Sequence, residues 1–236
     1  MSDPENLLFL FVSAAFYKKS ADFLFDKLAP KAKIIPNGID IDKFLFSLDK
    51  RNAIREKLNI KNETVIGNVG RFSEEKNHMF LLDVFARFMR LNPNSLLLLI
   101  GDGECKQGLM DRVKHLNIEQ NVIFYGTSSN IGELLSAMDI FVFPSFVEGL
   151  GIACIEAQVS GLPILCSDCV PNEARIADNV KAMSLNEGAN IWANALSSMV
   201  KDANRQSNAT LVQNAGYNIK DVAKLVKARY MERIDD

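Results

Sequence analysis

The central part of the chain alternates short apolar runs with amphipathic segments, and this alternation limits the folds it can adopt. The apolar runs have the length of buried strands and are found at 65–69, 95–100, 122–125, 140–143 and 163–166. The segments between them have helical periodicity and are found at 77–91, 105–116, 130–138 and 151–160. Apolar strands that alternate with helices are typical of a parallel sheet covered by helices on both faces. The sequence therefore predicts an α/β fold with a Rossmann-like, doubly wound parallel sheet.

Further elements are expected on both sides of this alternation. They are strands at 7–12 and 32–35 and helices at 14–28, 51–58, 188–203 and 219–234. The turn Pro36-Asn37-Gly38 closes the second of these strands, because proline fixes φ and Asn-Gly tolerates positive φ. Trp192 lies among apolar neighbours of a predicted helix, so we expect it in the core.

Composition and charge exclude several classes of protein. The chain has 236 residues and a net charge of −2, which gives no electrostatic attraction to nucleic acid. No apolar stretch is long enough to cross a bilayer, and the apolar run at 7–15 lacks the basic leader of a signal peptide. We therefore expect a cytoplasmic protein.

The four cysteines are expected to be free thiols that bind no metal. The spacing Cys166-Ser167-Asp168-Cys169 is compatible with a zinc or redox site, but no second cysteine pair completes a zinc site. The pair follows the apolar run 162–165, so it is better explained as the end of a buried strand.

Functional residue types follow several predicted strands at the point where each strand ends. Arg71, Gly101, Gly126 and Glu148 occupy such positions. Ligands of parallel sheets bind beyond the carboxyl ends of the strands, so these residues are expected at one shared site.

Two carboxylates flank the predicted start of the helix at 151–160. Glu148 falls in the loop before this helix and Glu156 falls inside it, with Gly149, Leu150 and Gly151 between them. Backbone N–H groups at a helix start bind phosphate, and two carboxylates can accept hydrogen bonds from two different sugars. The run is therefore typical of a site for a nucleotide-sugar, although two ordinary surface acids would give the same pattern.

Five motifs in register resemble those of retaining glycosyltransferases of family four (glycosyl transferases group 1), which have the GT-B fold. Glu148 and Glu156 match the E-x7-E signature of that family. The other matching motifs are Ile35-Pro36-Asn37-Gly38-Ile39-Asp40, the run 69–77 with Val69-Gly70-Arg71 and Lys76-Asn77, Ile100-Gly101-Asp102-Gly103, and Val122-Ile123-Phe124-Tyr125-Gly126. The resemblance extends from about residue 7 to the C-terminus.

Arg71 and Lys76 suit a pyrophosphate, and Gly70 allows close backbone approach. Cations there would stabilise the charge that develops on the leaving group, although a surface pair beside two glutamates is the alternative. The resemblance implies that Glu148 contacts donor-sugar hydroxyls near the reacting carbon, so Glu148, Arg71 and Lys76 are the predicted catalytic residues.

The remaining site residues are predicted to bind the donor. The resemblance implies that Glu156 binds the ribose hydroxyls and that Tyr125 and Gly126 lie by the nucleobase. Gly149, Leu150 and Gly151 would offer N–H groups to the phosphates, and Gly101 and Gly103 would let the chain pass close to the ligand. His78 follows Lys76 and Asn77, but a position outside the site is favoured for it.

The resemblance also implies a division of the chain. Residues 1–36 resemble the end of an N-terminal acceptor domain and its connection, 37–218 a nucleotide-sugar-binding domain, and 219–236 a C-terminal crossover helix. We therefore expect either a truncated chain or one whose partner half is separate, inactive in transfer without the missing N-terminal domain. Apolar positions of the last helix, at Val222, Leu225, Val226 and Tyr230, would then be partly exposed or would mediate a homodimer.

The predicted function is retaining transfer of a hexosyl group from a UDP-sugar to a glycan or lipid-linked acceptor in polysaccharide biosynthesis. The donor is a substrate, and no metal or other cofactor is expected. The full-length enzyme is expected to associate peripherally with the inner face of the membrane. The alternative is a non-catalytic nucleotide-sugar-binding module; an epimerase or a phosphorylase is disfavoured, because their catalytic motifs cannot be placed.

Overall fold

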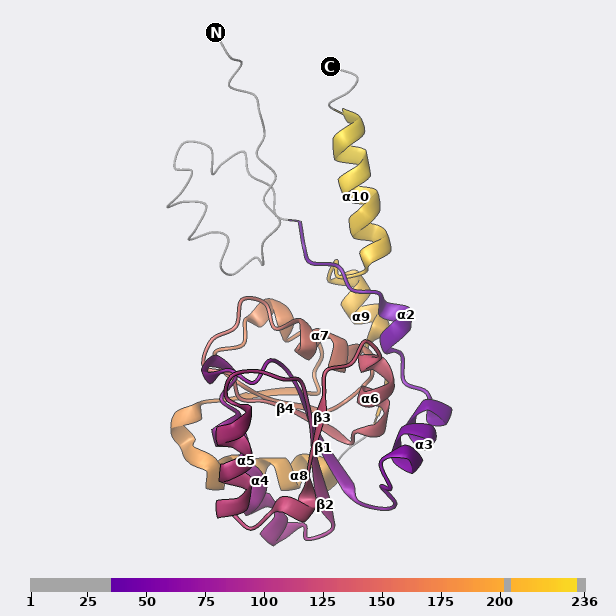
Figure 1. The fold of residues 1–236 in the computed structure, drawn as a ribbon. Helices are drawn as coiled ribbons and strands as arrows, with labels where there is room; N and C mark the ends of the chain where they lie inside the picture. The colour runs from indigo at the N-terminus through magenta and orange to yellow at the C-terminus, as the bar shows by residue number, and fades with distance from the viewer. Residues whose placement is uncertain (1–34, 202–204, 233–236) are drawn as a thin grey trace.

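The computed structural model describes residues 35–201 and 205–232, which form an α/β fold around one parallel sheet (Figure 1). The strand order is β3-β2-β1-β4-β5-β6, and every pairing is parallel. The strands are β1 (Thr64–Val69), β2 (Ser95–Ile100), β3 (Val122–Gly126), β4 (Ile140–Phe143), β5 (Ile164–Ser167) and β6 (Val180–Met183). The predicted Rossmann-like, doubly wound sheet is thus confirmed.

Nine α-helices are assigned within the described residues. They are α2 (Ile41–Phe44), α3 (Leu48–Lys57), α4 (His78–Leu91), α5 (Lys106–His115), α6 (Ile131–Ala137), α7 (Ile152–Val159), α8 (Gly188–Lys201), α9 (Ala209–Asn214) and α10 (Ile219–Glu232). Helix α3 begins earlier than the sequence predicted, because the Ser47 side chain accepts a hydrogen bond from the Lys50 N–H at 3.4 Å. Helices α2 and α9 were not predicted, since four and six residues are too few to establish a period.

The two faces of the sheet are covered by different helices, and alternate strand residues supply the two cores. Phe141 and Phe143 pack in the core beneath α3, α6 and α7. Ile140 and Val142 of the same strand pack in the core formed with α4, α5 and α8. Trp192 of α8 is fully buried in this second core, as expected.

The cysteines are free, as expected, although only part of the Cys166–Cys169 segment is buried. Cys166 lies in β5 and is buried, whereas Cys169 is exposed. Among the described residues, no group of three or more His, Cys, Asp or Glu side chains could hold a metal ion.

The strand order places a crevice between β1 and β4. The chain runs outward from β1 to β3 and then crosses to β4 on the other side of β1. The helices that follow β1 and β4, α4 and α7, therefore lie on opposite faces of the sheet, and ligands of such folds bind at the carboxyl edge between them.

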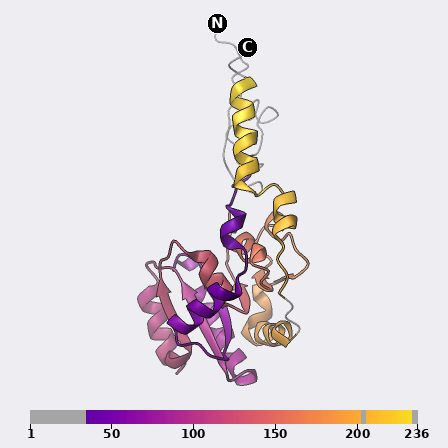
Figure 2. The ribbon, with the colours of Figure 1, turned by 90° about the vertical axis from the view of Figure 1, so that its right-hand side faces the viewer.

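The start of the described chain pairs with the segment just before α10. Ile39 forms a parallel bridge with Asn218, and its N–H donates to the Tyr217 carbonyl at 2.7 Å. Helix α10 then projects away from the rest of the fold (Figures 1 and 2). The segments predicted at 7–34 lie outside the described residues.

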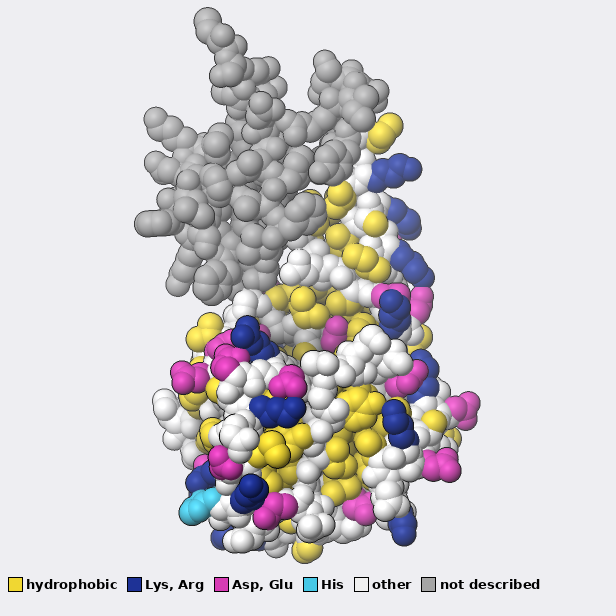
Figure 3. Space-filling view, viewed as in Figure 1, with side chains coloured by type: hydrophobic (Ala, Val, Ile, Leu, Met, Phe, Trp, Pro, Cys, Tyr) yellow, Lys and Arg dark blue, Asp and Glu magenta, His cyan; other side chains and the backbone are white. Residues whose placement is uncertain are grey.

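Apolar and basic side chains gather on different sides of α10 (Figure 3). Leu225 is 41% exposed, whereas Val222, closer to the rest of the fold, is buried. The expectation of partial exposure is thus confirmed for Leu225. None of the helices within 35–201 and 205–232 has the length and apolar character of a membrane-spanning helix.

Candidate functional site

Two loops meet at the crevice between β1 and β4. The loop after β1 carries Lys76 and the loop after β4 carries Glu148. Lys76 Nζ lies 2.6 Å from Glu148 Oε1, in a position where the Glu148 side chain is only 5% exposed. The structure therefore brings together two predicted catalytic side chains that are far apart in the sequence.

Two hydrogen bonds to backbone carbonyls hold the same two loops together. The Phe146 N–H donates to the Glu75 carbonyl at 2.8 Å, and Asn77 Nδ2 donates to the Pro144 carbonyl at 3.1 Å. Asn77 has a left-handed backbone, which an asparagine adopts more readily than most residues. The position of Lys76 is thus fixed by contacts on both sides of it.

A pocket of about 490 Å³ opens between these loops and the start of α7. Gly70, Lys76 and Glu148 line one part of it, and Gly151, Ile152 and Ala153 line another; Gly149 and Leu150 also contribute. Gly151 is the N-cap of α7 at φ 82°, a conformation that favours glycine. A pocket that is bordered by a lysine and by a helix N-terminus has positive potential, which suits an anion.

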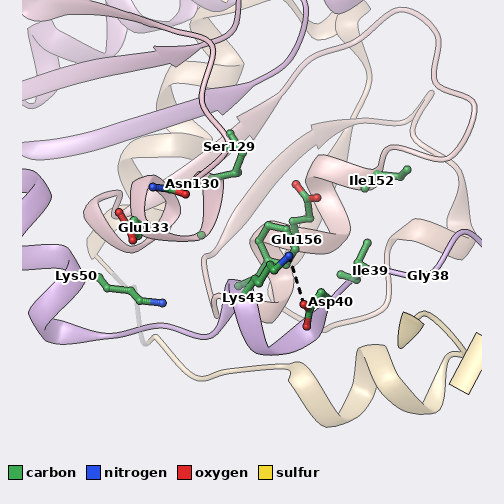
Figure 4. A pocket seen from close by; sticks show the side chains of 13 residues that line it. Gly38, Ile39, Asp40, Lys43, Lys50, Ser129, Asn130, Glu133, Ile152 and Glu156 are labelled. Atoms are coloured by element: carbon green, nitrogen blue, oxygen red, sulfur yellow. Dashed lines mark ion pairs between the residues drawn. The ribbon is translucent and has the colours of Figure 1, made fainter. Parts of the chain in front are cut away.

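A second pocket of about 770 Å³ adjoins the first at Ile152, which lines both. Figure 4 shows Glu156 of α7 facing the segment around Lys43 on one side and the loop around Asn130 on the other. No described residue forms a hydrogen bond or an ion pair with the Glu156 carboxylate. Burial raises the pKa of Glu156 to about 7. Its partly buried oxygens are therefore available to a ligand in this pocket.

Arg71 is not brought to Lys76 in this structure. Its side chain is 70% exposed and lies 3.1 Å from Glu104, and it lines neither pocket. Glu104 lies in the loop after β2, and nothing in the sequence pattern indicated this pairing. Arg71 is therefore not among the residues that line the two pockets.

Gly101 and Gly103 lie against the backbone of the β1 loop. A Cβ at Gly101 would lie 1.9 Å from the Gly70 carbonyl oxygen, and one at Gly103 would lie 2.5 Å from that of Phe72. The Gly101 N–H also donates to the Gly126 carbonyl at 3.0 Å. These glycines thus let the loop after β2 pack closely against the backbone of the loop after β1, at Gly70 and Phe72.

Tyr125 and Gly126 were predicted to lie beside the nucleobase, but other residues near them in the sequence line the second pocket. The Tyr125 hydroxyl accepts a hydrogen bond from Lys57 at 3.3 Å, and neither Tyr125 nor Gly126 lines either of these two pockets. The wall is built by 129–133 and, opposite it, by Gly38–Phe44 residues of the turn and α2. The 129–133 segment follows Gly126 closely, so its position after a strand was the signal that could have identified it.

Known proteins resemble this chain in sequence and in fold. It is 35% identical over 170 residues to EpsF of Bacillus subtilis, a candidate glycosyltransferase, covering 70% of this chain and 44% of EpsF. It is 32% identical over 154 residues to the Escherichia coli UDP-Gal:alpha-D-GlcNAc-diphosphoundecaprenol alpha-1,3-galactosyltransferase, covering 62% of this chain and 39% of that enzyme. The chain thus spans less than half the length of these two curated relatives.

The crystal structure of HepE from Anabaena in complex with UDP-glucose has the same fold. It superimposes with a TM-score of 0.73 at 22% identity, covering 91% of this chain and 62% of HepE. The family model described as glycosyl transferases group 1 matches residues 50–216, a range that contains Lys76, Glu148 and Glu156. The chain therefore belongs to the glycosyl transferases group 1 family.

Proposed function

We propose that this chain binds the nucleotide-diphospho-sugar donor, a UDP-sugar, of a retaining hexosyltransferase. The observation that carries the proposal is the pair of adjoining pockets on the two sides of the α7 start. One is bordered by a lysine and a helix N-terminus, which suit a diphosphate, and the other by the Glu156 carboxylate, which has no partner among the described residues. The nucleoside would occupy the second pocket, with its ribose hydroxyls donating to Glu156.

The charge arrangement supports a role for Lys76 in stabilising the leaving group. In glycosyl transfer the bond between the sugar and the phosphate breaks, and negative charge grows on the diphosphate. An ammonium group at that position stabilises the transition state more than the ground state. The diphosphate would draw Lys76 away from Glu148, which would leave the buried Glu148 oxygens to accept hydrogen bonds from the sugar.

The residues of the smaller pocket support retention without a covalent intermediate on the protein. Glu148 is the one carboxylate among the described residues that line this pocket, and in the proposed complex its oxygens are occupied by hydrogen bonds from the sugar hydroxyls. A two-carboxylate mechanism needs both acids beside the reacting carbon. In the proposed mechanism the acceptor attacks from the face that the diphosphate leaves, and the departing phosphate takes the acceptor proton. No metal is proposed, because Lys76 and α7 supply positive potential.

The relatives support the donor and acceptor classes. The E. coli relative is named for a UDP-galactose donor and a diphosphoundecaprenol-linked acceptor, and the HepE structure contains UDP-glucose. We therefore propose a glycan or lipid-linked acceptor and a place in polysaccharide biosynthesis. Holding the acceptor against the donor carbon would fall to a further domain, with which this chain would form the complete enzyme.

Calorimetric titration with UDP tests the proposal. Lys76→Met keeps the length of the side chain but removes the charge, and it should weaken UDP binding by about 1.5–3 kcal/mol. Lys106→Met is the matched control, because Lys106 forms an ion pair with Asp102 at 2.9 Å but lines neither pocket. Equal affinity of the Lys76→Met and Lys106→Met variants for UDP would contradict the proposed site.

A further inference from the structure

A buried polar pair lies directly beneath the Lys76 loop. Asn68 of β1 is 2% exposed and His78, the first residue of α4, is also 2% exposed. His78 Nε2 lies 2.9 Å from Asn68 Oδ1, and Asn68 Nδ2 donates to the Val142 carbonyl of β4 at 2.8 Å. One hydrogen-bonded chain therefore joins β4, β1 and the start of α4 under the crevice.

The hydrogen bonds fix the direction of donation in this chain. Because Asn68 Nδ2 donates to a carbonyl, Asn68 Oδ1 must be the acceptor in its contact with His78. His78 therefore carries its proton on Nε2. Burial and the nearby Lys76 lower the pKa of His78 to about 4, so the imidazole is neutral near pH 7. The rings of Phe72 and His78 pack edge to face, with their centroids 5.0 Å apart, and this contact confines the imidazole further.

The Asn68 amide and the stem of Lys76 both lie near Gly70. A methyl group added at Gly70 would lie 3.8 Å from Lys76 Cγ and 3.9 Å from Asn68 Oδ1, so the stem and the amide both border Gly70. Asn77, between Lys76 and His78, donates to the Pro144 carbonyl. Lys76 is thus held at its carboxyl side by two successive buried residues that are bonded to different strands or loops of the crevice.

We infer that Asn68 and His78 are a positioning pair that sets Lys76 for the donor diphosphate. The inference rests on the proposed function, since it concerns how Lys76 meets that ligand. An ordinary core-filling role would require only the shape of the imidazole. A positioning role requires the donor at Nε2, because that hydrogen bond ties the start of α4 to the strand below the site.

A matched pair of substitutions separates these two roles. The amide nitrogen of Gln reaches the place of the imidazole Nε2, whereas that of Asn reaches only the place of Nδ1. We expect UDP affinity, measured by calorimetry, to fall about three- to tenfold in His78→Asn and to stay within about twofold of the original in His78→Gln. A similar loss in both variants would overturn the inference, and so would no loss in either.

A double-mutant cycle with Lys76→Met tests whether His78 acts through Lys76. If it does, His78→Asn should change UDP affinity by less than about twofold when Lys76 is already replaced. An equal loss with and without Lys76 would assign His78 a general structural role and overturn the inference. If Lys76→Met alone leaves UDP affinity unchanged, the proposed donor site fails instead, so the two failures are distinguishable.

Discussion

The amino and carboxyl edges of the sheet differ in how their partly buried carboxylates are paired. At the amino edge Asp139, just before β4, lies 2.6 Å from both Arg51 and Arg55 and accepts from the Val65 N–H at 2.8 Å. At the carboxyl edge the Glu156 carboxylate has no partner among the described residues, and Lys76 and Glu148 have each other. A carboxylate is thus fully partnered at one edge and left available at the other.

Arginine side chains at the amino edge also form hydrogen bonds with the backbone carbonyls at the end of a helix. Arg51, Arg55 and Arg205 donate to the backbone carbonyls of residues 135–138, at the carboxyl end of α6. Burial and the neighbouring Arg51 lower the pKa of Arg205 to about 9, so it remains a cation at neutral pH. Cations at a helix carboxyl end oppose its negative dipole. This cluster therefore has a structural purpose.

Unpartnered polar atoms gather instead near the crevice. Of the four buried side-chain atoms without a hydrogen-bond partner in the described residues, three belong to Ser73, His78 and Ser145. All three lie in the loops after β1 and β4 or at the start of α4. Buried polar groups are usually satisfied, so the concentration of unsatisfied atoms near the crevice is consistent with the ligand site proposed there.

The largest expected effect is the loss of stability when the ion pairs at the amino edge are removed. Asp139→Asn leaves Arg51 and Arg55 without their carboxylate and should lower the free energy of unfolding by about 3 kcal/mol, measured by urea denaturation. UDP affinity of the folded variant should be unchanged. Asp42→Asn is the control, because Asp42 forms an equally short but exposed pair with Lys220, and it should shift stability by less than about 0.5 kcal/mol. Similar losses in the two variants would remove the contrast between the edges.

Glu156→Gln should act in the opposite direction on stability. The folded state holds the Glu156 proton up to a pKa of about 7, above the ordinary glutamate value of 4.5. The folded state therefore binds more protons than the unfolded state between these values, and stability falls as pH rises through that window. Glutamine does not ionise, so the variant should be more stable than the original by roughly 1–2 kcal/mol at pH 8 and show no such fall.

The same variant should lose nucleotide affinity while it gains stability. UDP binding should weaken, whereas inorganic pyrophosphate, which has no ribose, should bind as before. A fall in affinity for both ligands would mean that Glu156 acts on the phosphate pocket or on the fold, and not on the nucleoside.

The sequence predicted the carboxyl edge better than the amino edge, for a physical reason. Lys76, Glu148 and Glu156 stand at strand ends or a helix start, where the chain order alone places them at one edge. Arg51, Asp139 and Arg205 belong to distant segments, and each taken alone resembles an ordinary surface charge. Strand β6 was missed because only Met183 of its four residues, at the sheet margin, is buried, so the strand gives no apolar run.

The pH dependence of donor binding should be a moderate effect. Hydroxyl groups donate stronger hydrogen bonds to an ionised Glu156 than to a protonated one, so UDP-glucose affinity should rise by about three- to tenfold between pH 6 and pH 8. UDP-glucose is preferable to UDP here, because its diphosphate carries no group that titrates in that range. The rise should be absent in Glu156→Gln; if it persists there, another group titrates.

The smallest expected effect concerns Arg71, which is paired like the charges of the amino edge but lies in a loop at the carboxyl edge. Its exposed pair with Glu104 should contribute little to stability, so Arg71→Ala should shift the free energy of unfolding by less than about 0.5 kcal/mol. If Arg71 turns toward the diphosphate, the same substitution should weaken UDP binding by about 1 kcal/mol, less than loss of Lys76, because Glu104 competes for the guanidinium. Glu104→Ala removes that competitor and should strengthen UDP binding slightly. Calorimetry on the two variants decides the matter: if neither changes UDP affinity, Arg71 belongs with the surface charges and Lys76 is left as the cation of the donor site.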